Sequence, residues 1–334
     1  MKVIVFDTET TGLSPLDNPA RFPYTPAGKG EKKAIETKIT SPNPEVAFPA
    51  WSEWIESWPF IIQISYIVYD LDTDKYSMYN KYVEDLPEGL AEHFLGDPAT
   101  HYTVRNALIA RSKAEPTERA PIRQIIEDFT EVLKQDITLV AHNLQYDFNM
   151  LLSEIYRTQV KLGDPAFYQQ NSSILVSKPK YCTVCVGEYK SKIQTTSKAG
   201  NLYYKKPTLK QLHNKLFGYY PIEESLHDSM IDVVVTTRCF YRMFASPKKG
   251  VLCGVGEPDV YLKTMEENPD EINIRHYIER KITPPGVDPR GIGELNLCAN
   301  TYEAPAVKKG GKRRKSKNKR RRYNKTKRRS YRRA

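Results

Sequence analysis

Long apolar runs and paired cysteines are both missing from this 334-residue sequence. The most apolar stretch, 58–69, is interrupted by proline, glutamine and serine, so we expect no segment to span a membrane. Only residues 3–6 are apolar before the first acid, too few for a signal peptide. Five cysteines, an odd number, argue against a disulfide scaffold, and the single C-x-x-C pair, Cys182 and Cys185, lacks the second pair typical of zinc sites. The sequence therefore predicts a soluble, intracellular protein.

Acidic residues are absent from the last 27 positions, 308–334, which contain 17 Lys and Arg. The chain as a whole has a net charge of +11, but residues 1–307 hold 34 basic and 40 acidic residues. We expect the tail to be disordered and to bind polyanions without sequence preference, or to serve as a nuclear address. In composition it resembles the tails of giant DNA virus proteins.

The chain up to about residue 245 alternates between strand and helix patterns, which predicts an α/β domain over 1–245. Segment 14–59 holds eight of the 23 prolines and is expected to be an ordered-loop insertion without long helices. Segment 246–307 is a C-terminal extension to which we assign no role, with one helix near 270–280. The expected elements are a buried strand over 3–6, a hairpin of 60–69 and 75–83, helices over 121–133, from Asn143, over 207–217 and over 225–244, and strands over 137–141 and 181–186.

Two acids, Asp7 and Glu9, follow the first buried strand at positions i and i+2, so their side chains point to the same side of the sheet. Carboxylates held together against an apolar wall repel each other unless a cation lies between them, and a divalent metal ion is the simplest such cation. For an isolated D-x-E pair, two exposed loop acids are the commoner arrangement.

Two further segments favour a metal site. Asp147 lies in the first turns of the helix that follows strand 137–141. Asp232 lies on a helix face that it shares with Val235 and Cys239, and charged groups are seldom left among such residues without a partner.

Three motifs, FDTETTGL at 6–13, LVAHNLQYDFNML at 139–151 and HDSMIDV at 227–233, resemble those of DnaQ-like 3′-5′ exonucleases of the DEDDh type. The resemblance covers residues 2–245 and implies an RNase H-like fold, a mixed five-stranded sheet flanked by helices. It also implies a two-metal hydrolase that uses Mg²⁺ or Mn²⁺ and releases nucleoside 5′-monophosphates from 3′ ends. By the same resemblance, the metal-binding acids are Asp7, Glu9, Asp147 and Asp232, and the general base is His227.

The spacing before Asp232 selects the histidine subtype, because the tyrosine subtype needs Tyr at position 228, which is Asp228. Ser225 and Asp228 form an S-x-x-D pattern that predicts a capping box and a helix start there, with His227 at the fraying first turn. In the alternative interpretation, Asp228 and Asp232 are the working pair and His227 is a surface residue.

Substrate contacts carried over from the family fall on Thr8, Thr10 and Leu13. In that family the backbone after the first acid contacts the terminal nucleotide, and an apolar residue packs on its base. Asn143 either contacts substrate or caps the following helix, and the sequence favours neither.

Two aromatic groups lie outside the motifs. Segment 187–210 interleaves six lysines with three tyrosines, a pattern typical of single-strand binding, although an ordinary solvated loop fits almost as well. Trp51, Trp54 and Trp58 share one helical face, which most often packs on the core and less often forms a stacking or docking surface.

Two functions compete. The first is a 3′-5′ exonuclease for proofreading, repair or RNA processing, acting on single-stranded or frayed 3′ ends of DNA or RNA, with a polymerase as a further partner. The second is a non-catalytic nucleic-acid-binding or packaging protein that uses its basic tail. The basic tail is compatible with a location in the nucleus, in a viral factory or in a virion. The five family positions favour the enzyme, because a scaffold has no need to keep repelling carboxylates together.

Overall fold

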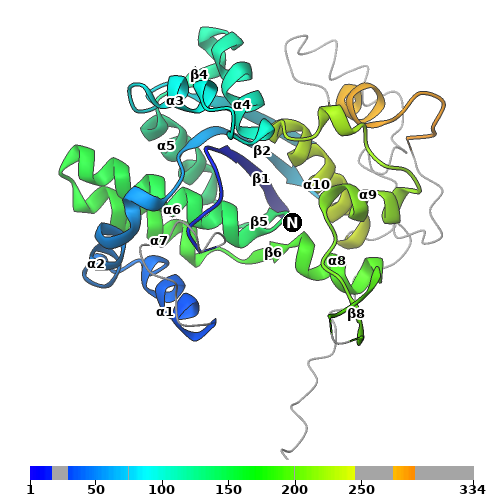
Figure 1. Cartoon of the computed structure of the whole chain (residues 1–334), viewed down its shortest axis with the longest axis horizontal. Coiled ribbons are helices and arrows are strands. Elements are labelled where there is room, and N and C mark those ends of the chain that lie inside the picture. The colour runs from blue at the N-terminus through cyan, green and yellow to red at the C-terminus, as the bar shows by residue number, and fades with distance from the viewer. Residues whose placement is uncertain (17–28, 74, 199, 245–273, 290–334) are drawn as a thin grey trace, which may run out of the picture. The chain divides into compact units, whose positions relative to one another are not determined.

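A computed structural model describes residues 1–16, 29–73, 75–198, 200–244 and 274–289 (Figure 1). These residues belong to a compact unit that covers 1–302, and a second unit covers 303–334. The basic tail over 308–334 and most of the extension over 246–307 lie outside the described residues. Within the described ranges, no helix combines the length and apolar character needed to cross a bilayer.

A six-stranded sheet in the order β4-β3-β2-β1-β5-β6 forms the centre of the unit. The hairpin of β2 and β3 is antiparallel, as predicted, and β2 also pairs antiparallel with β1. The other three pairings, β1 with β5, β5 with β6 and β3 with β4, are parallel. The two-residue β4 is one strand more than the five expected. The strands are β1 (Lys2–Thr10), β2 (Ile61–Asp70), β3 (Lys75–Val83), β4 (Arg119–Ala120), β5 (Ile137–Ala141) and β6 (Lys180–Cys182).

Helices cover both faces of the sheet, which explains why β1 is apolar on both sides. Ile4 and Phe6 are fully buried in one cluster, with residues of α5 (Ile122–Leu133), α6 (Leu144–Leu162) and α7 (Pro165–Ser177). Val3 and Val5 are fully buried in a second cluster, with α9 (Leu209–Phe217) and α10 (Ser229–Phe244). A strand buried on both faces reads as a continuous apolar run. Asp7 and Glu9 have the same parity along β1 as Val3 and Val5, so they belong to the α10 side of the sheet.

The proline-rich insertion contains two eleven-residue helices, α1 (Lys29–Ile39) and α2 (Pro44–Trp54), followed by a short 3₁₀ turn, η2 (Ile55–Ser57). The prediction that it lacks long helices is therefore wrong. Pro44 begins α2 at its first position, where a helix needs no N–H donor. Trp51, Trp54 and Trp58 are at most 3% exposed, and the Trp51 indole donates a hydrogen bond to the Ile39 carbonyl. The tryptophan stripe is part of the core.

The strand expected over 3–6 continues to Thr10, so Asp7 and Glu9 lie within β1 rather than after it. Two further predicted boundaries also differ from the structure. Strand β6 ends at Cys182, where α8 (Thr183–Ser191) begins, so the strand expected over 181–186 is wrong beyond Cys182. Helix α10 begins at Ser229 rather than Ser225, which lies in the 3₁₀ turn η4 (Glu223–Ser225). The Asp228 carboxylate accepts hydrogen bonds from the N–H groups of residues 230 and 231 and so caps α10 itself.

The remaining described elements lie at the edges of the unit. Tyr277 and its neighbours, within the extension, pack onto α10, since Ile274, Ile278 and Ile282 are buried in the α10 cluster. The fully buried Arg238 of α10 donates hydrogen bonds to His213 and to the Tyr219 hydroxyl. The remaining described elements are α3 (Leu90–Gly96), α4 (Tyr102–Lys113), η3 (Pro116–Glu118), β7 (Gln194–Thr196), β8 (Leu202–Tyr204), α12 (Ile274–His276) and the π-helix η6 (Tyr277–Ile282).

Candidate active site

The first two acids lie at the carboxyl end of β1, where pairing with β2 becomes irregular. Asp7 is opposite Ser65 and Glu9 is opposite Gln63, and the register shifts between Glu9 and Thr10. Such irregularities bend a strand and re-aim its side chains, and they are common beside active sites. The D-x-E motif thus lies at the carboxyl end of a central strand, as the sequence predicts.

Asp147 reaches the same edge from the other layer of helices. It lies in the first turn of α6 and is 2% exposed. Its Oδ1 atom accepts hydrogen bonds from the Thr8 backbone N–H at 3.1 Å and the Thr8 hydroxyl at 2.8 Å, across 139 residues of sequence. Thr8 therefore holds this carboxylate against β1 between the two acids of the motif.

Asp232 comes from the first turn of α10, and Ser229 docks that turn on the sheet. The Ser229 hydroxyl donates to the Asp7 carbonyl oxygen at 2.8 Å, and the Ser229 N–H donates to Gln63 Oε1 at 3.3 Å. Asp232 Oδ2 accepts from the His227 N–H at 3.4 Å, whereas Asp232 Oδ1 is buried without a hydrogen-bond partner. A buried carboxylate oxygen in this state needs a cation or a proton.

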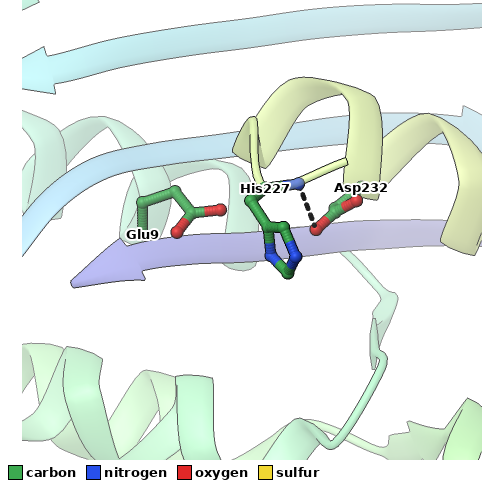
Figure 2. Close-up of side chains that lie close together, drawn as sticks. All are labelled: Glu9, His227 and Asp232. Carbon is green, nitrogen blue, oxygen red and sulfur yellow. Dashed lines mark hydrogen bonds between the residues drawn. The ribbon is translucent and has the colours of Figure 1, made fainter. Parts of the chain in front are cut away.

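Glu9, His227 and Asp232 lie close enough together to share one ion (Figure 2). Each offers a ligand atom, and these atoms all lie within 4.8 Å of one another. In Figure 2 the imidazole is drawn between the two carboxylates, in front of the strand β1. Asp7 and Asp147 are outside this group of three but interact electrostatically with it.

Burial and mutual repulsion raise the pKa values of all four acids. For Asp7 the pKa is about 7, because of burial first and the nearby Asp228 second. The pKa of Glu9 lies well above its usual range because of burial and then repulsion by Asp7 and the other acids. Burial, followed by repulsion from Asp7, likewise raises the pKa values of Asp147 and Asp232. Because their pKa values are raised, the four acids bind protons in competition with any cation that the site would bind.

The donor set fits a hard divalent cation. It consists mainly of carboxylate oxygens, which Mg²⁺ and Mn²⁺ prefer, and includes the unpaired oxygen of Asp232. It contains no thiolate, since Cys182 and Cys185 lie at the junction of β6 and α8.

His227 lies two residues before α10, in the left-handed region with φ of +71°, and its side chain is exposed. Its Nε2 atom lies 3.2 Å from the Tyr102 hydroxyl at the start of α4, and the two rings meet edge to face. Partial desolvation of the ring, then the charge of His101, lowers the pKa of His227. The ring is therefore neutral at neutral pH, with one nitrogen able to accept a proton.

The expected substrate contacts differ in exposure. Thr8 is buried and bound to Asp147, and the buried Thr10 hydroxyl donates to the Gly12 carbonyl at 2.8 Å. Leu13 is 56% exposed. Asn143 occupies the N-cap position of α6 with φ of +72°, as the capping interpretation predicts, but its side chain makes no capping hydrogen bond. Its exposed side chain stays a candidate for substrate contact.

Sequence reasoning missed three residues that organise the site, namely Tyr102, Gln63 and Ser229. Ser229 lies inside the HDSMIDV motif, so a closer look at its hydroxyl would have suggested a docking role. Tyr102 and Gln63 have no such signal, because each meets the site only through the fold, and 125 residues separate Tyr102 from His227. No protein-family model matches this sequence, and no curated protein matches it.

Proposed function

We propose that the chain is a metal-dependent 3′-5′ exonuclease with an RNase H-like fold, which hydrolyses phosphodiester bonds at nucleic-acid 3′ ends and releases nucleoside 5′-monophosphates. Five of the six strands, in the order β3-β2-β1-β5-β6 and with antiparallel β2, correspond to the mixed sheet expected of that fold. Helices on both faces agree with the same assignment.

One observation carries the proposal. The five residues that match the family motifs come from β1, α6 and the start of α10, yet all lie at the carboxyl end of β1. Contacts across 139 and 222 residues of sequence hold the three segments together. Chance agreement of the motifs would not bring their acids to one place, and a purely structural site would not keep repelling carboxylates together.

Glu9 and Asp232, with Asp7 and Asp147, would hold the Mg²⁺ or Mn²⁺ ions. Bound there, such ions supply charge neutralisation for phosphate and an acidified water. Thr8 orients the Asp147 carboxylate, and the His227 N–H orients that of Asp232. The imidazole of His227, neutral at pH 7 because its pKa is lowered, accepts the proton of the attacking water. Tyr102 orients the ring by its contact with Nε2.

The test is digestion of a 3′-labelled single-stranded oligonucleotide with Mn²⁺ or Mg²⁺, comparing the parent chain with Asp7→Asn and Asp232→Asn. We expect release of labelled mononucleotide by the parent and at least a hundredfold slower release by both variants, because each removes a charged metal ligand. The control is Asp85→Asn, which alters a surface acid paired with Lys161 and should leave the rate unchanged.

Release by Asp7→Asn at the parent rate would refute the proposal. Absence of mononucleotide release from the parent, with binding retained, would favour the competing non-catalytic function. Matched single-stranded DNA, RNA and mismatched duplex ends in the same assay define the substrate class.

A further inference from the structure

The segment between α8 and α9 forms a hairpin of its own. In it β7 pairs antiparallel with β8, and the Lys205 N–H extends the pairing by donating to the Ile193 carbonyl at 2.8 Å. The turn is closed by hydrogen bonds between Ser197 and Asn201, including one from the Asn201 N–H to the Ser197 hydroxyl at 3.0 Å. We call residues 189–206 the lysine–tyrosine hairpin. Figure 1 shows β8 projecting from the end of α8, beyond the edge of the main sheet.

Both faces of this hairpin expose large apolar side chains. Leu202, Tyr203 and Tyr204 are 72%, 52% and 39% exposed, and Tyr189 at the end of α8 is 55% exposed. Neighbouring residues of a strand point to opposite faces, so Tyr203 lies on one face and Leu202 and Tyr204 lie on the other. Among the described residues, none of these tyrosine rings stacks on another aromatic ring. An isolated two-stranded ribbon is marginally stable, so packing within the hairpin does not account for these rings.

The charge of the hairpin is of one sign. Residues 189–206 contain five lysines and no acid. Three of these lysines, Lys192, Lys198 and Lys206, are exposed. A ligand that suits this surface must carry repeated negative charge and flat apolar groups together. Single-stranded nucleic acid has both, with phosphates for the lysines and bases for the tyrosines.

The base of the hairpin is fixed to the same edge of the sheet as the candidate active site. His142 lies between β5 and α6. Its ring is hydrogen-bonded to the Pro207 carbonyl, and its Nδ1 atom lies 3.0 Å from the Thr183 hydroxyl. Gly187 of α8 packs so closely on Pro207 that a Cβ atom there would lie 3.1 Å from the proline ring. The base of the hairpin is therefore attached at the end of the sheet that carries the candidate active site.

We infer that the lysine–tyrosine hairpin binds the single-stranded part of the nucleic acid whose 3′ end occupies the active site. Lysines contact phosphates and tyrosines stack on bases, so binding does not depend on base sequence. The inference rests on the proposed function for the identity of the bound end, whereas the binding surface itself can be tested without catalysis.

Binding is measured by fluorescence anisotropy of 5′-labelled (dT)₂₀ and (rU)₂₀ at about 150 mM salt, in full-length protein carrying Asp7→Asn to prevent digestion. We expect the pair Tyr203→Ala and Tyr204→Ala to weaken binding about tenfold or more, because both surfaces on which bases would stack are lost. Lys198→Glu should weaken it severalfold. The matched control is Lys75→Glu, which changes an exposed lysine at the opposite end of the sheet and should have no effect.

A second measurement locates the contact. A strand with 5-iodouracil is cross-linked by ultraviolet light, and peptides are mapped by mass spectrometry. Cross-links at Tyr203 or Tyr204 support the inference. Unchanged affinity in the tyrosine variant, for both strands, overturns it. The inference is also overturned if the tyrosine variant has a lower melting temperature and the parent forms no cross-link at Tyr203 or Tyr204. The rings are then covered by another part of this chain.

Failure of the hairpin and failure of the nuclease give different results. The p-nitrophenyl ester of thymidine 5′-monophosphate offers one nucleotide, so hairpin variants with an intact active site should hydrolyse it at the parent rate. If the parent does not hydrolyse this ester or any oligonucleotide, yet the hairpin variants lose affinity, the nuclease proposal fails and the binding surface stands.

Discussion

At the scale of single residues, the contact between Tyr102 and His227 matters most for the chemistry. His227 is exposed and lies outside a regular helix, so few neighbours restrain its ring. The Tyr102 hydroxyl, 3.2 Å from Nε2, is the hydrogen-bonding group that faces that nitrogen. A general base depends on its orientation as well as on its pKa. Tyr102 is thus a positioning residue for the proposed base.

We expect Tyr102→Phe to lower kcat about fivefold, because one hydrogen bond contributes about 1 kcal/mol. KM should change less than twofold, since the hydroxyl positions the base rather than the substrate. The measurement is hydrolysis of the thymidine p-nitrophenyl ester over a range of substrate concentrations.

Tyr79→Phe is the matched control, because it also removes one hydroxyl, which donates to Asp128 at 2.9 Å on the opposite face of the sheet. A parent-like kcat for Tyr102→Phe, or the same loss in both variants, would contradict a positioning role.

At the scale of elements, Arg157 of α6 joins the proline-rich insertion to the core. Its guanidinium donates to the carbonyls of Ile55, Trp58 and Pro59 and lies 4.0 Å from the centre of the Phe60 ring. It also pairs with Glu154, which is 4% exposed, at 2.7 Å. The arginine thus satisfies the carbonyls of the chain that enters β2.

Arg157→Ala should lower the free energy of unfolding by about 3–5 kcal/mol, because it leaves the Glu154 charge buried and unpaired. The measurement is urea unfolding. Adding Glu154→Gln should recover part of the loss, since a neutral amide costs less to bury.

Arg123→Ala is the control for a surface pair, because the side chains of Arg123 and Glu127 are 55% and 39% exposed, and it should cost about 0.5 kcal/mol or less. Equal costs at the two arginines would show that burial does not decide the value of the pair at Arg157.

The elements also show how far the sequence can predict this fold. Runs of β-branched and aromatic residues predicted the hairpin of β2 and β3, a short apolar run predicted the strand β5, and helical spacing of apolar residues predicted the helix α5. Proline content misled in the insertion, since Pro44 occupies a helix position that suits it. The S-x-x-D pattern misled at α10, because Asp228 accepts the first N–H groups by itself.

The four acids and His227 that gather at the candidate site could be picked out of the sequence because each motif is short and local. Tyr102 and Gln63 were not, since they join the site only through pairing and packing between distant segments. The segment after Tyr181 was ambiguous because the mostly apolar run Cys182–Val186 fits a strand as well as a buried helix.

At the scale of the whole molecule, the acid cluster makes folding sensitive to pH in the absence of divalent cations. Asp7 has a pKa of about 7 in the folded protein against 3.8 for an ordinary aspartate. Between these values the folded state holds a proton that the unfolded chain has released. Stability should therefore fall as pH rises from about 4 to about 7.

In EDTA, we expect the melting temperature to be lower at pH 7.5 than at pH 5.0 by about 5 °C. Mg²⁺ should raise it more at pH 7.5, where the acids are ionised and bind the cation better. Asp7→Asn should reduce the difference between the two pH values. The same difference in this variant would show that other groups cause it.

The longest-range contact in the site also bears on how the protein is made. The Ser229 hydroxyl meets the Asp7 carbonyl across 222 residues, and Asp232 is further along the chain still. During translation, β1 leaves the ribosome before α10, so the candidate site lacks Asp232 until the start of α10 has emerged. The proposed nuclease site is therefore incomplete until the start of α10 has been synthesised.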